Sequence, residues 1–206
     1  MTRVYAAIAV GAVAALLGGT AWYVFARNSA DPLAPCRSSV VAGGSGAIGG
    51  PFTLVDHNGT EVTEKDVLTK PSLVYFGYTF CPDVCPVDTV RNAEVIDILD
   101  EMGHEVTPVF VTVDPGRDTP EVLADYAENI HPRMIGLTGT EAQIAAAAKA
   151  YRVVYQADEK KDDYYLVGHM TFTYLMDPEK GFLDFFRREI PADQMAAQVA
   201  CFLENS

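Results

Sequence analysis

Apolar and polar residues alternate along the chain in blocks that predict strands and helices in turn. Ser72–Tyr78 is a run of β-branched and aromatic residues without alternation, as expected for a central strand that is buried on both faces. After a short loop that contains two cysteines, apolar residues recur near helical spacing up to Gly103. This spacing predicts a helix, with apolar positions at Val87, Val90, Val95, Ile98 and Leu99.

The alternation of strands and helices continues toward the C-terminus. Thr119 and Pro120 are suited to the N-cap and first position of a helix, and Gln143 can complete a capping box with Thr140. The pattern predicts strands at Val106–Val113, Ile135–Leu137, Val153–Gln156, Thr171–Met176 and Phe182–Arg187, with helices at 120–129, 140–151 and 191–203. An α/β sandwich built on a mixed sheet is therefore expected.

The N-terminal quarter differs in character from the rest. Val4–Phe25 contains no charged residue over 22 positions, which is long enough to cross a bilayer as a helix. A cleaved signal peptide is the alternative, but its apolar region is shorter, so length favours an uncleaved anchor. A glycine-rich stretch at 42–50 is typical of a flexible tether, and Phe52–Asp56 with Glu61–Thr63 predicts a hairpin around an Asn-Gly turn.

These features divide the chain into a transmembrane anchor at 1–27, a tether at 28–50 and a folded domain at 51–206. No Arg-rich and Ser-rich transit peptide precedes the anchor. We therefore expect a single-pass protein of the bacterial inner membrane with its C-terminal domain in the periplasm.

Charge limits the classes of partner. The formal net charge is -13 at pH 7, and no cluster of Lys and Arg interrupts it. Electrostatic binding of nucleic acid or of an anionic membrane surface is thus not expected. The plain interpretation of the negative charge is that it keeps the protein soluble. The more specific interpretation is that it attracts a basic protein partner.

The cysteines supply the candidate chemistry. Cys81 and Cys85 flank a Pro-Asp-Val sequence between the predicted central strand and the following helix, where backbone N–H groups and the helix dipole favour thiolates. If the helix begins at Val84 or Cys85, the two sulfurs lie within reach of each other across one turn. They could then share a metal ion or form a disulfide.

The ligand set narrows the choice of metal. Structural zinc prefers four nitrogen or sulfur ligands, and only two cysteines cluster here. Two thiolates and one imidazole suit copper(I), whereas copper(II) recruits a further donor. Among the histidines, His57, His104 and His131 are interpreted as solvated loop residues, whereas His169 follows Gly168 at the mouth of a predicted strand and is the candidate third ligand.

Several neighbours have plainer interpretations. Met170 is expected to pack in the core, because successive strand residues point to opposite faces. Asp83 fits turn chemistry or an additional oxygen donor for copper(II). Whether Cys36 and Cys201 pair is left open, although an oxidising compartment would favour a disulfide.

Four segments carry a resemblance to a known family through nearly the whole domain: Gly49–Asp56, Val74–Pro86, Val111–Pro120 and Gly136–Thr140. In this order they resemble the signature stretches of the Sco/SenC family, which is known for delivering copper to the binuclear copper site of cytochrome c oxidase. The third contains Asp114–Asp118, which also fits a turn tied by an Arg/Asp pair. Met170 stands where the family favours a small hydroxyl residue.

The resemblance implies a thioredoxin-like fold, related to peroxiredoxins, with Cys81, Cys85 and His169 as ligands of one copper ion, Cu(I) or Cu(II). It implies a copper chaperone rather than an enzyme, with cytochrome c oxidase subunit II or another copper-acquiring protein as recipient and an upstream periplasmic copper donor.

The alternative is a membrane-anchored thiol-disulfide oxidoreductase that uses Cys81 and Cys85 as a redox pair to reduce the cysteines of that copper site. A peroxiredoxin-like peroxidase rests on fold analogy alone.

Overall fold

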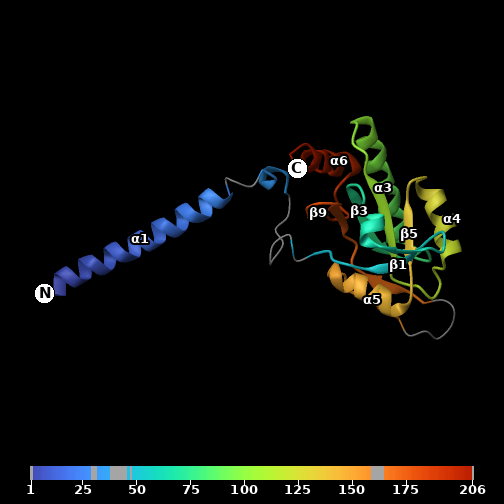
Figure 1. The fold of residues 1–206 in the computed structure, drawn as a ribbon, viewed down its shortest axis with the longest axis horizontal. Helices are drawn as coiled ribbons and strands as arrows, with labels where there is room; N and C mark the ends of the chain where they lie inside the picture. The colour runs from blue at the N-terminus through green and yellow to red at the C-terminus, as the bar shows by residue number, and fades with distance from the viewer. Residues whose placement is uncertain (1, 29–31, 38–45, 47, 159–164, 206) are drawn as a thin grey trace.

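The computed structural model describes residues 2–28, 32–37, 46, 48–158 and 165–205 of the chain. Within them, a mixed sheet of seven strands has the order β2-β1-β5-β4-β3-β8-β9 (Figure 1). Its strands are β1 (Thr53–Asp56), β2 (Glu61–Thr63), β3 (Ser72–Gly77), β4 (Thr107–Thr112), β5 (Ile135–Thr138), β8 (Thr173–Asp177) and β9 (Gly181–Phe186). This thioredoxin-like α/β arrangement confirms the predicted fold class.

Strand β3 lies in the middle of the sheet, and every one of its residues is buried. It pairs in parallel with β4 on one side and antiparallel with β8 on the other. A strand enclosed in this way has no polar face, which explains the uninterrupted apolar run in its sequence. The loop that follows its C-terminal end carries the two free cysteines.

Helices cover both faces of the sheet. Helices α3 (Val84–Glu101), α4 (Pro120–Ile130) and α6 (Ala192–Asn205) lie on one side, and α5 (Glu141–Ala150) lies on the other (Figure 1). Phe110 of β4 packs against Tyr126 of α4, with ring centroids 4.9 Å apart. Phe76 of β3 packs against Tyr151, which follows α5, at 5.2 Å. Full burial of a phenylalanine side chain such as Phe76 or Phe110 contributes about 1.5–3 kcal/mol to the hydrophobic stabilisation.

The start of each predicted helix agrees well with the structure. The Thr119 side chain accepts a hydrogen bond from the Val122 amide at the start of α4. Thr140 and Gln143 form the expected capping box at the start of α5. A one-turn helix that the sequence did not predict, α2 (Glu64–Val67), follows β2.

The polarity of α3 runs against the sequence prediction in its first half. Val87 and Val90 were expected to face the core, but their side chains are 60% and 56% exposed. The buried residues of these turns are Cys85, Asp88 and Thr89, together with Asn92 one turn further on. The prediction was wrong here because this end of the helix points sulfur and polar groups inward, toward a site rather than a purely apolar core.

A separate two-stranded sheet completes the α/β domain. It pairs β6 (Tyr155–Ala157) with β7 (Val167–His169) in antiparallel register, so that Tyr155 lies opposite His169. The sequence predicted a strand near β6 but none at β7, because three residues are too few to show a period. His169 therefore ends a strand of its own, ahead of β8.

The N-terminal segment forms helix α1 (Thr2–Asn28), which contains the predicted membrane span at 4–25 and extends away from the domain (Figure 1). Among the residues that the structure describes, no helix combines the length and apolar character that crossing a membrane requires. The predicted transmembrane anchor is therefore not confirmed.

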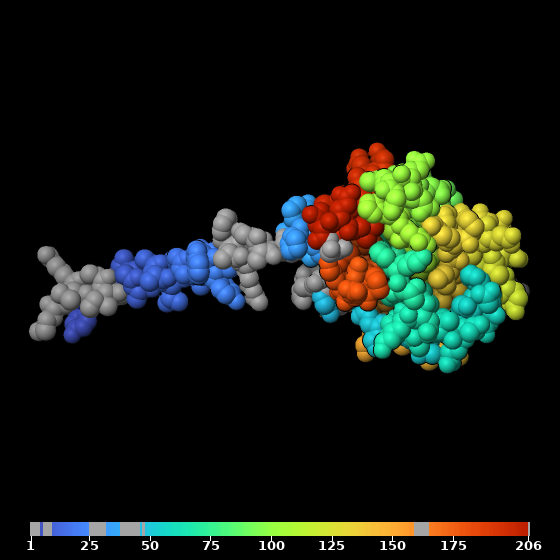
Figure 2. Space-filling model, turned by 45° about the horizontal axis from the view of Figure 1, so that its top comes forward, coloured from blue at the N-terminus to red at the C-terminus, as the bar shows by residue number. Residues whose placement is uncertain are grey.

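Part of the predicted tether is packed. A 3-10 helix, η1 (Ala34–Cys36), contacts α6 (Figure 2). Leu33 and Cys36 are buried with residues of α6. Cys36 forms a disulfide with Cys201 of α6, with their Cα atoms 5.6 Å apart. Positions 38–45 and 47, which include most of the glycine-rich stretch, lie outside the described residues.

Candidate metal centre

The two free cysteines lie in the loop between β3 and α3 and in the first turn of α3. Cys81 is 9% exposed and Cys85 is fully buried. The Cys85 amide donates a hydrogen bond to the Cys81 sulfur at 3.4 Å. As the sequence predicted, the start of the helix at Val84 brings two sulfurs four residues apart to one side of the same turn.

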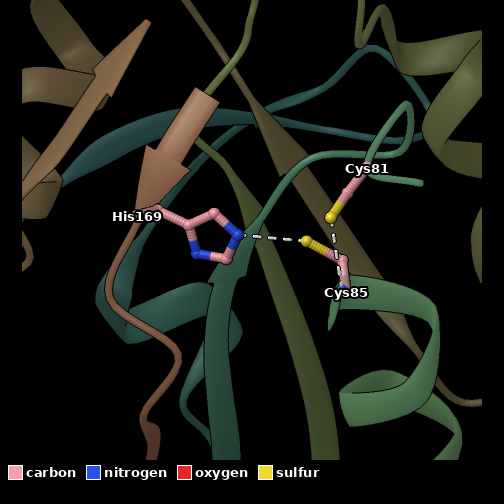
Figure 3. A group of neighbouring side chains, drawn as sticks. All are labelled: Cys81, Cys85 and His169. Carbon is pink, nitrogen blue, oxygen red and sulfur yellow. Dashed lines mark hydrogen bonds between the residues drawn. The ribbon is translucent and has the colours of Figure 1, made fainter. Parts of the chain in front are cut away.

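His169 reaches the same place from the end of β7. Its Nε2 atom lies 3.1 Å from the Cys85 sulfur. The three potential ligand atoms, two sulfurs and one ring nitrogen, all lie within 4.8 Å of one another. Figure 3 shows the three side chains pointing toward one another from separate segments of the chain. No other such group of His, Cys, Asp or Glu side chains occurs in the described ranges.

The orientation of the imidazole follows from its second nitrogen. Nδ1 lies 3.0 Å from the Met170 carbonyl oxygen, which can only accept a hydrogen bond. Nδ1 therefore carries the proton, and the lone pair of Nε2 points toward the cysteines. The rings of Tyr75 and Tyr78 stand edge-on to the imidazole, with centroids at 6.1 Å and 5.9 Å, and hold its plane.

The two thiols differ electrostatically. Burial alone would raise the pKa of Cys81, but hydrogen bonds from the backbone amides of Cys85 and Asp83 outweigh it and lower that pKa. Burial raises the pKa of the Cys85 thiol. Burial also lowers the pKa of His169, which keeps its imidazole neutral. Cys81 is therefore the readier thiolate, and Cys85 must release a proton before it can bind a metal.

A buried carboxylate lies behind the site. The Tyr75 hydroxyl donates to Asp88 Oδ2 at 3.0 Å, and Arg188 Nε lies 3.6 Å from Asp88 Oδ1. Burial, together with the charges of Cys85 and Asp88, raises the pKa of Tyr75. Sequence analysis did not single out Tyr75 or Asp88. The one available signal was the polar residue at position 88, three residues after Cys85 on the same helical face.

The structure also tests the plainer interpretations. Arg117 Nε donates to Asp114 Oδ2 at 2.5 Å, which confirms the Arg/Asp pair in that turn. Asp83 is exposed and makes no side-chain cap at the start of α3. Met170 is partly buried and packs against the core, as expected.

The remaining histidines lie apart from the group. His57 accepts a hydrogen bond from the Gly136 amide, and His104 lies 3.5 Å from a carboxylate oxygen of Glu204. His131 was expected to be solvated, but it is only 7% exposed. That prediction was wrong because His131 ends α4 and turns back against Asp97 of α3.

The donor set fits a soft metal ion. Two sulfurs and a neutral imidazole in a partly enclosed site match the preference of copper(I), and three ligands fall short of the four that structural zinc requires. In the absence of metal, the same sulfurs are close enough for redox chemistry.

Comparison with known families identifies one match. The family model described as SCO1/SenC matches residues 41–204. The chain is 49% identical over 203 residues to Protein SenC of Rhodobacter capsulatus, which covers 98% of this chain and 91% of that protein. It is 40% identical over 160 residues to the human mitochondrial protein SCO1 homolog, covering 76% of this chain and 53% of the human one. The chain thus spans about half the length of that mitochondrial relative.

Solved structures show the same similarity. Arabidopsis thaliana ScoI with copper bound superposes with a TM-score of 0.75 at 41% identity, covering 78% of this chain and all of that one, 100%. Bradyrhizobium japonicum ScoI with copper bound gives a TM-score of 0.68 at 39% identity, covering 75% of this chain and 98% of that one.

Proposed function

The chain belongs to the SCO1/SenC family, and from this premise we propose that it is a copper chaperone for the assembly of cytochrome c oxidase. It takes one copper ion on Cys81, Cys85 and His169 and passes it to the binuclear copper site of subunit II. The observation that carries the proposal is the convergence of two thiol sulfurs and an unprotonated imidazole nitrogen within 4.8 Å. The copper-bound structures of relatives support the choice of metal.

Copper is the cargo in this proposal, so the site must both hold and release it. Cys85 is fully buried, whereas Cys81 and His169 keep some exposed surface. Because three ligands leave copper(I) open to a further donor, a thiolate of the recipient can bind before a ligand of this chain leaves. We expect Cys81 and His169 to be exchanged first and Cys85 last.

The same proposal includes a compartment and partners. We propose that the domain works in the bacterial periplasm, attached to the inner membrane through its N-terminal segment, and receives copper from a periplasmic donor. The Cys36–Cys201 disulfide supports an oxidising compartment. Separation of periplasmic and membrane fractions under non-reducing conditions tests both location and attachment.

The alternative function is thiol-disulfide exchange, favoured by the unequal thiols. The Cys81 thiolate would attack a disulfide of the recipient, forming a mixed disulfide and displacing one recipient thiolate. The Cys85 thiolate would then attack Cys81, so that the recipient leaves as a dithiol and Cys81–Cys85 becomes a disulfide. Two electrons pass to the recipient, and His169 is not required.

Copper(I) titration of the fully reduced chain separates the two functions. We would compare the native chain with Cys81→Ser, Cys85→Ser and His169→Ala, using His104→Ala as a matched control outside the site. One copper bound by the native chain and by the control, with weaker binding by all three site variants, is expected. A native chain that binds no copper but exchanges disulfides through Cys81 would reject the chaperone proposal.

A further inference from the structure

We propose that the loop Asp114–Asp118 is a latch that positions the two halves of the metal site, with Asp118 and Tyr165 as its positioning residues. One half is the cysteine loop, and the other is the β6–β7 sheet that carries His169. The latch rests on the proposed function only in taking copper as the metal. Its contacts are independent of any metal ion.

The first arm of the latch holds the cysteine loop. Asp118 is fully buried and accepts three hydrogen bonds. They come from the Thr79 amide at 3.1 Å, the Thr79 hydroxyl at 2.6 Å and the Thr112 hydroxyl at 2.5 Å. Thr79 lies two residues before Cys81, so Asp118 fixes the backbone from which Cys81 projects. Hydrogen bonds to a charged acceptor are about twice as strong as neutral ones.

The second arm holds the segment that leads to His169. The Tyr165 hydroxyl donates to Asp114 Oδ1 at 2.6 Å, while Arg117 Nε bonds the other carboxylate oxygen of Asp114. The Arg117 guanidinium carbon lies 3.7 Å from the centroid of the Tyr165 ring. Tyr165 is therefore held both at its hydroxyl and at its ring face. It precedes His169 by four residues, at the entry to β7.

Arg117 also joins the two arms. Its guanidinium carbon lies 5.0 Å from the Phe80 ring and 5.6 Å from the Tyr78 ring, both of which belong to the cysteine loop. The arginine thus lies among aromatic rings from both halves of the site. Cation–π contacts of this kind contribute about 0.5–2 kcal/mol each.

Such a latch has a physical purpose in this fold. Strands β6 and β7 pair only with each other and are not hydrogen-bonded into the seven-stranded sheet. The main sheet therefore does not fix the position of His169 relative to the cysteines. The latch supplies contacts that hold this small sheet beside the cysteine loop.

Loss of the second arm should affect the imidazole more than the sulfurs. The two cysteines stay together because the first turn of α3 holds them, so copper(I) affinity should fall less than copper(II) affinity. Binding of copper(II), which depends more on nitrogen donors, should weaken. This difference separates positioning from a general loss of stability.

The test compares Tyr165→Phe with Tyr155→Phe in the full chain. Each change removes one phenol hydroxyl, Tyr165→Phe from the segment that enters β7 and Tyr155→Phe from β6. The Tyr165 hydroxyl bonds Asp114, whereas the Tyr155 hydroxyl forms no hydrogen bond within the described ranges of the structure. With copper(II) added, Tyr165→Phe should lose affinity by about tenfold or more and lose the nitrogen hyperfine signal, as His169→Ala does. Tyr155→Phe should match the native chain with either copper ion, and the copper(I) affinity of Tyr165→Phe should fall by less than its copper(II) affinity.

A measurement without metal keeps the latch testable by itself. Hydrogen exchange of the β7 amides should accelerate in Tyr165→Phe and in Asp114→Asn, but not in Tyr155→Phe. Native exchange in both latch variants would overturn the proposal, as would a native copper(II) spectrum in Tyr165→Phe. If the native chain binds no copper, the chaperone function fails while the exchange result still decides whether the latch exists.

Discussion

At the scale of single residues, Gly77 shows how closely the site is packed. It ends β3 directly below the cysteine loop. A Cβ atom there would lie 2.8 Å from Tyr75 Cε1, 3.1 Å from the Cys85 sulfur and 3.1 Å from Phe110 Cε2. Only glycine leaves room for the Cys85 sulfur and both rings, because carbon and sulfur atoms do not approach so closely without displacement.

Replacing Gly77 with alanine should therefore disturb the site as well as the core. We expect a loss of about 1–3 kcal/mol in the free energy of unfolding, the usual effect of overpacking. Copper(I) affinity should also fall, because the added methyl group pushes the Cys85 sulfur away from its partners. Urea unfolding and copper(I) titration measure the two effects.

Gly168→Ala is the control for that change. Gly168 adjoins His169, but a Cβ there meets nothing closer than the Gln156 carbonyl oxygen at 3.8 Å. Its copper affinity should stay close to native. Native copper affinity in Gly77→Ala would show that the Cys85 sulfur tolerates displacement.

Some residues of the candidate site could be predicted from the sequence, and others could not. Cys81 and Cys85 are recognisable by their spacing and position, and the structure brings His169 to them as the resemblance implied. Tyr75 and Asp88 could not be found in the same way, because their role depends on a contact between a strand and a helix face. Pairwise contacts of this kind have no sequence period.

At the scale of elements, the end of α4 carries a pH-sensitive group. His131 is buried there, and its Nδ1 accepts a hydrogen bond from the Arg133 amide at 3.1 Å. Burial lowers the pKa of His131 below its ordinary value, and the Arg133 charge adds to the effect. The folded protein therefore favours the neutral ring.

The sign of the pH effect follows from that lowered pKa. Because the unfolded chain binds the proton at higher pH than the folded one, stability should be full above about pH 6.5 and should fall as the pH drops toward the folded pKa. An asparagine side chain offers an acceptor to the Arg133 amide without titrating, so His131→Asn should flatten this part of the profile. Chemical unfolding of the native chain and of His131→Asn at about pH 8 and about pH 5 measures this loss of stability. An equal loss in the two proteins would contradict the assignment of the pH effect to His131.

Whole elements were the most predictable level of the structure. The central strands, the helices after them and the N-terminal hairpin follow from periodicity, caps and turn residues. Strand β7 was missed because it is short, and the buried face of α3 was misjudged at Val87 and Val90 because the site reverses the usual polarity there. Both departures lie beside the candidate metal centre.

At the scale of the whole molecule, the Cys36–Cys201 disulfide closes a loop across a sequence separation of 165 residues. A disulfide that closes a long loop lowers the conformational entropy of the unfolded chain. Native disulfides typically stabilise a fold by about 2–5 kcal/mol in this way. The double variant Cys36→Ser and Cys201→Ser should lose that amount in the free energy of unfolding. Its copper(I) affinity should be unchanged, since neither residue contacts the site.

Thermal unfolding and copper titration of the double variant check this expectation. Treatment of the native chain with a mild reductant provides a second route to the same state. An unchanged melting temperature would mean that the packing of Leu33 and η1 against α6 suffices without the bond.

The same disulfide changes the covalent topology of the molecule. Backbone and sulfur bridge together form a closed ring from Cys36 to Cys201, and helix α1 is a branch attached to that ring at Cys36. A single backbone cut anywhere between the two cysteines opens the ring but releases no fragment. A cut before Cys36 releases helix α1 without a reductant. After a cut between Cys36 and the folded domain, helix α1 stays attached through the disulfide until a reductant breaks it.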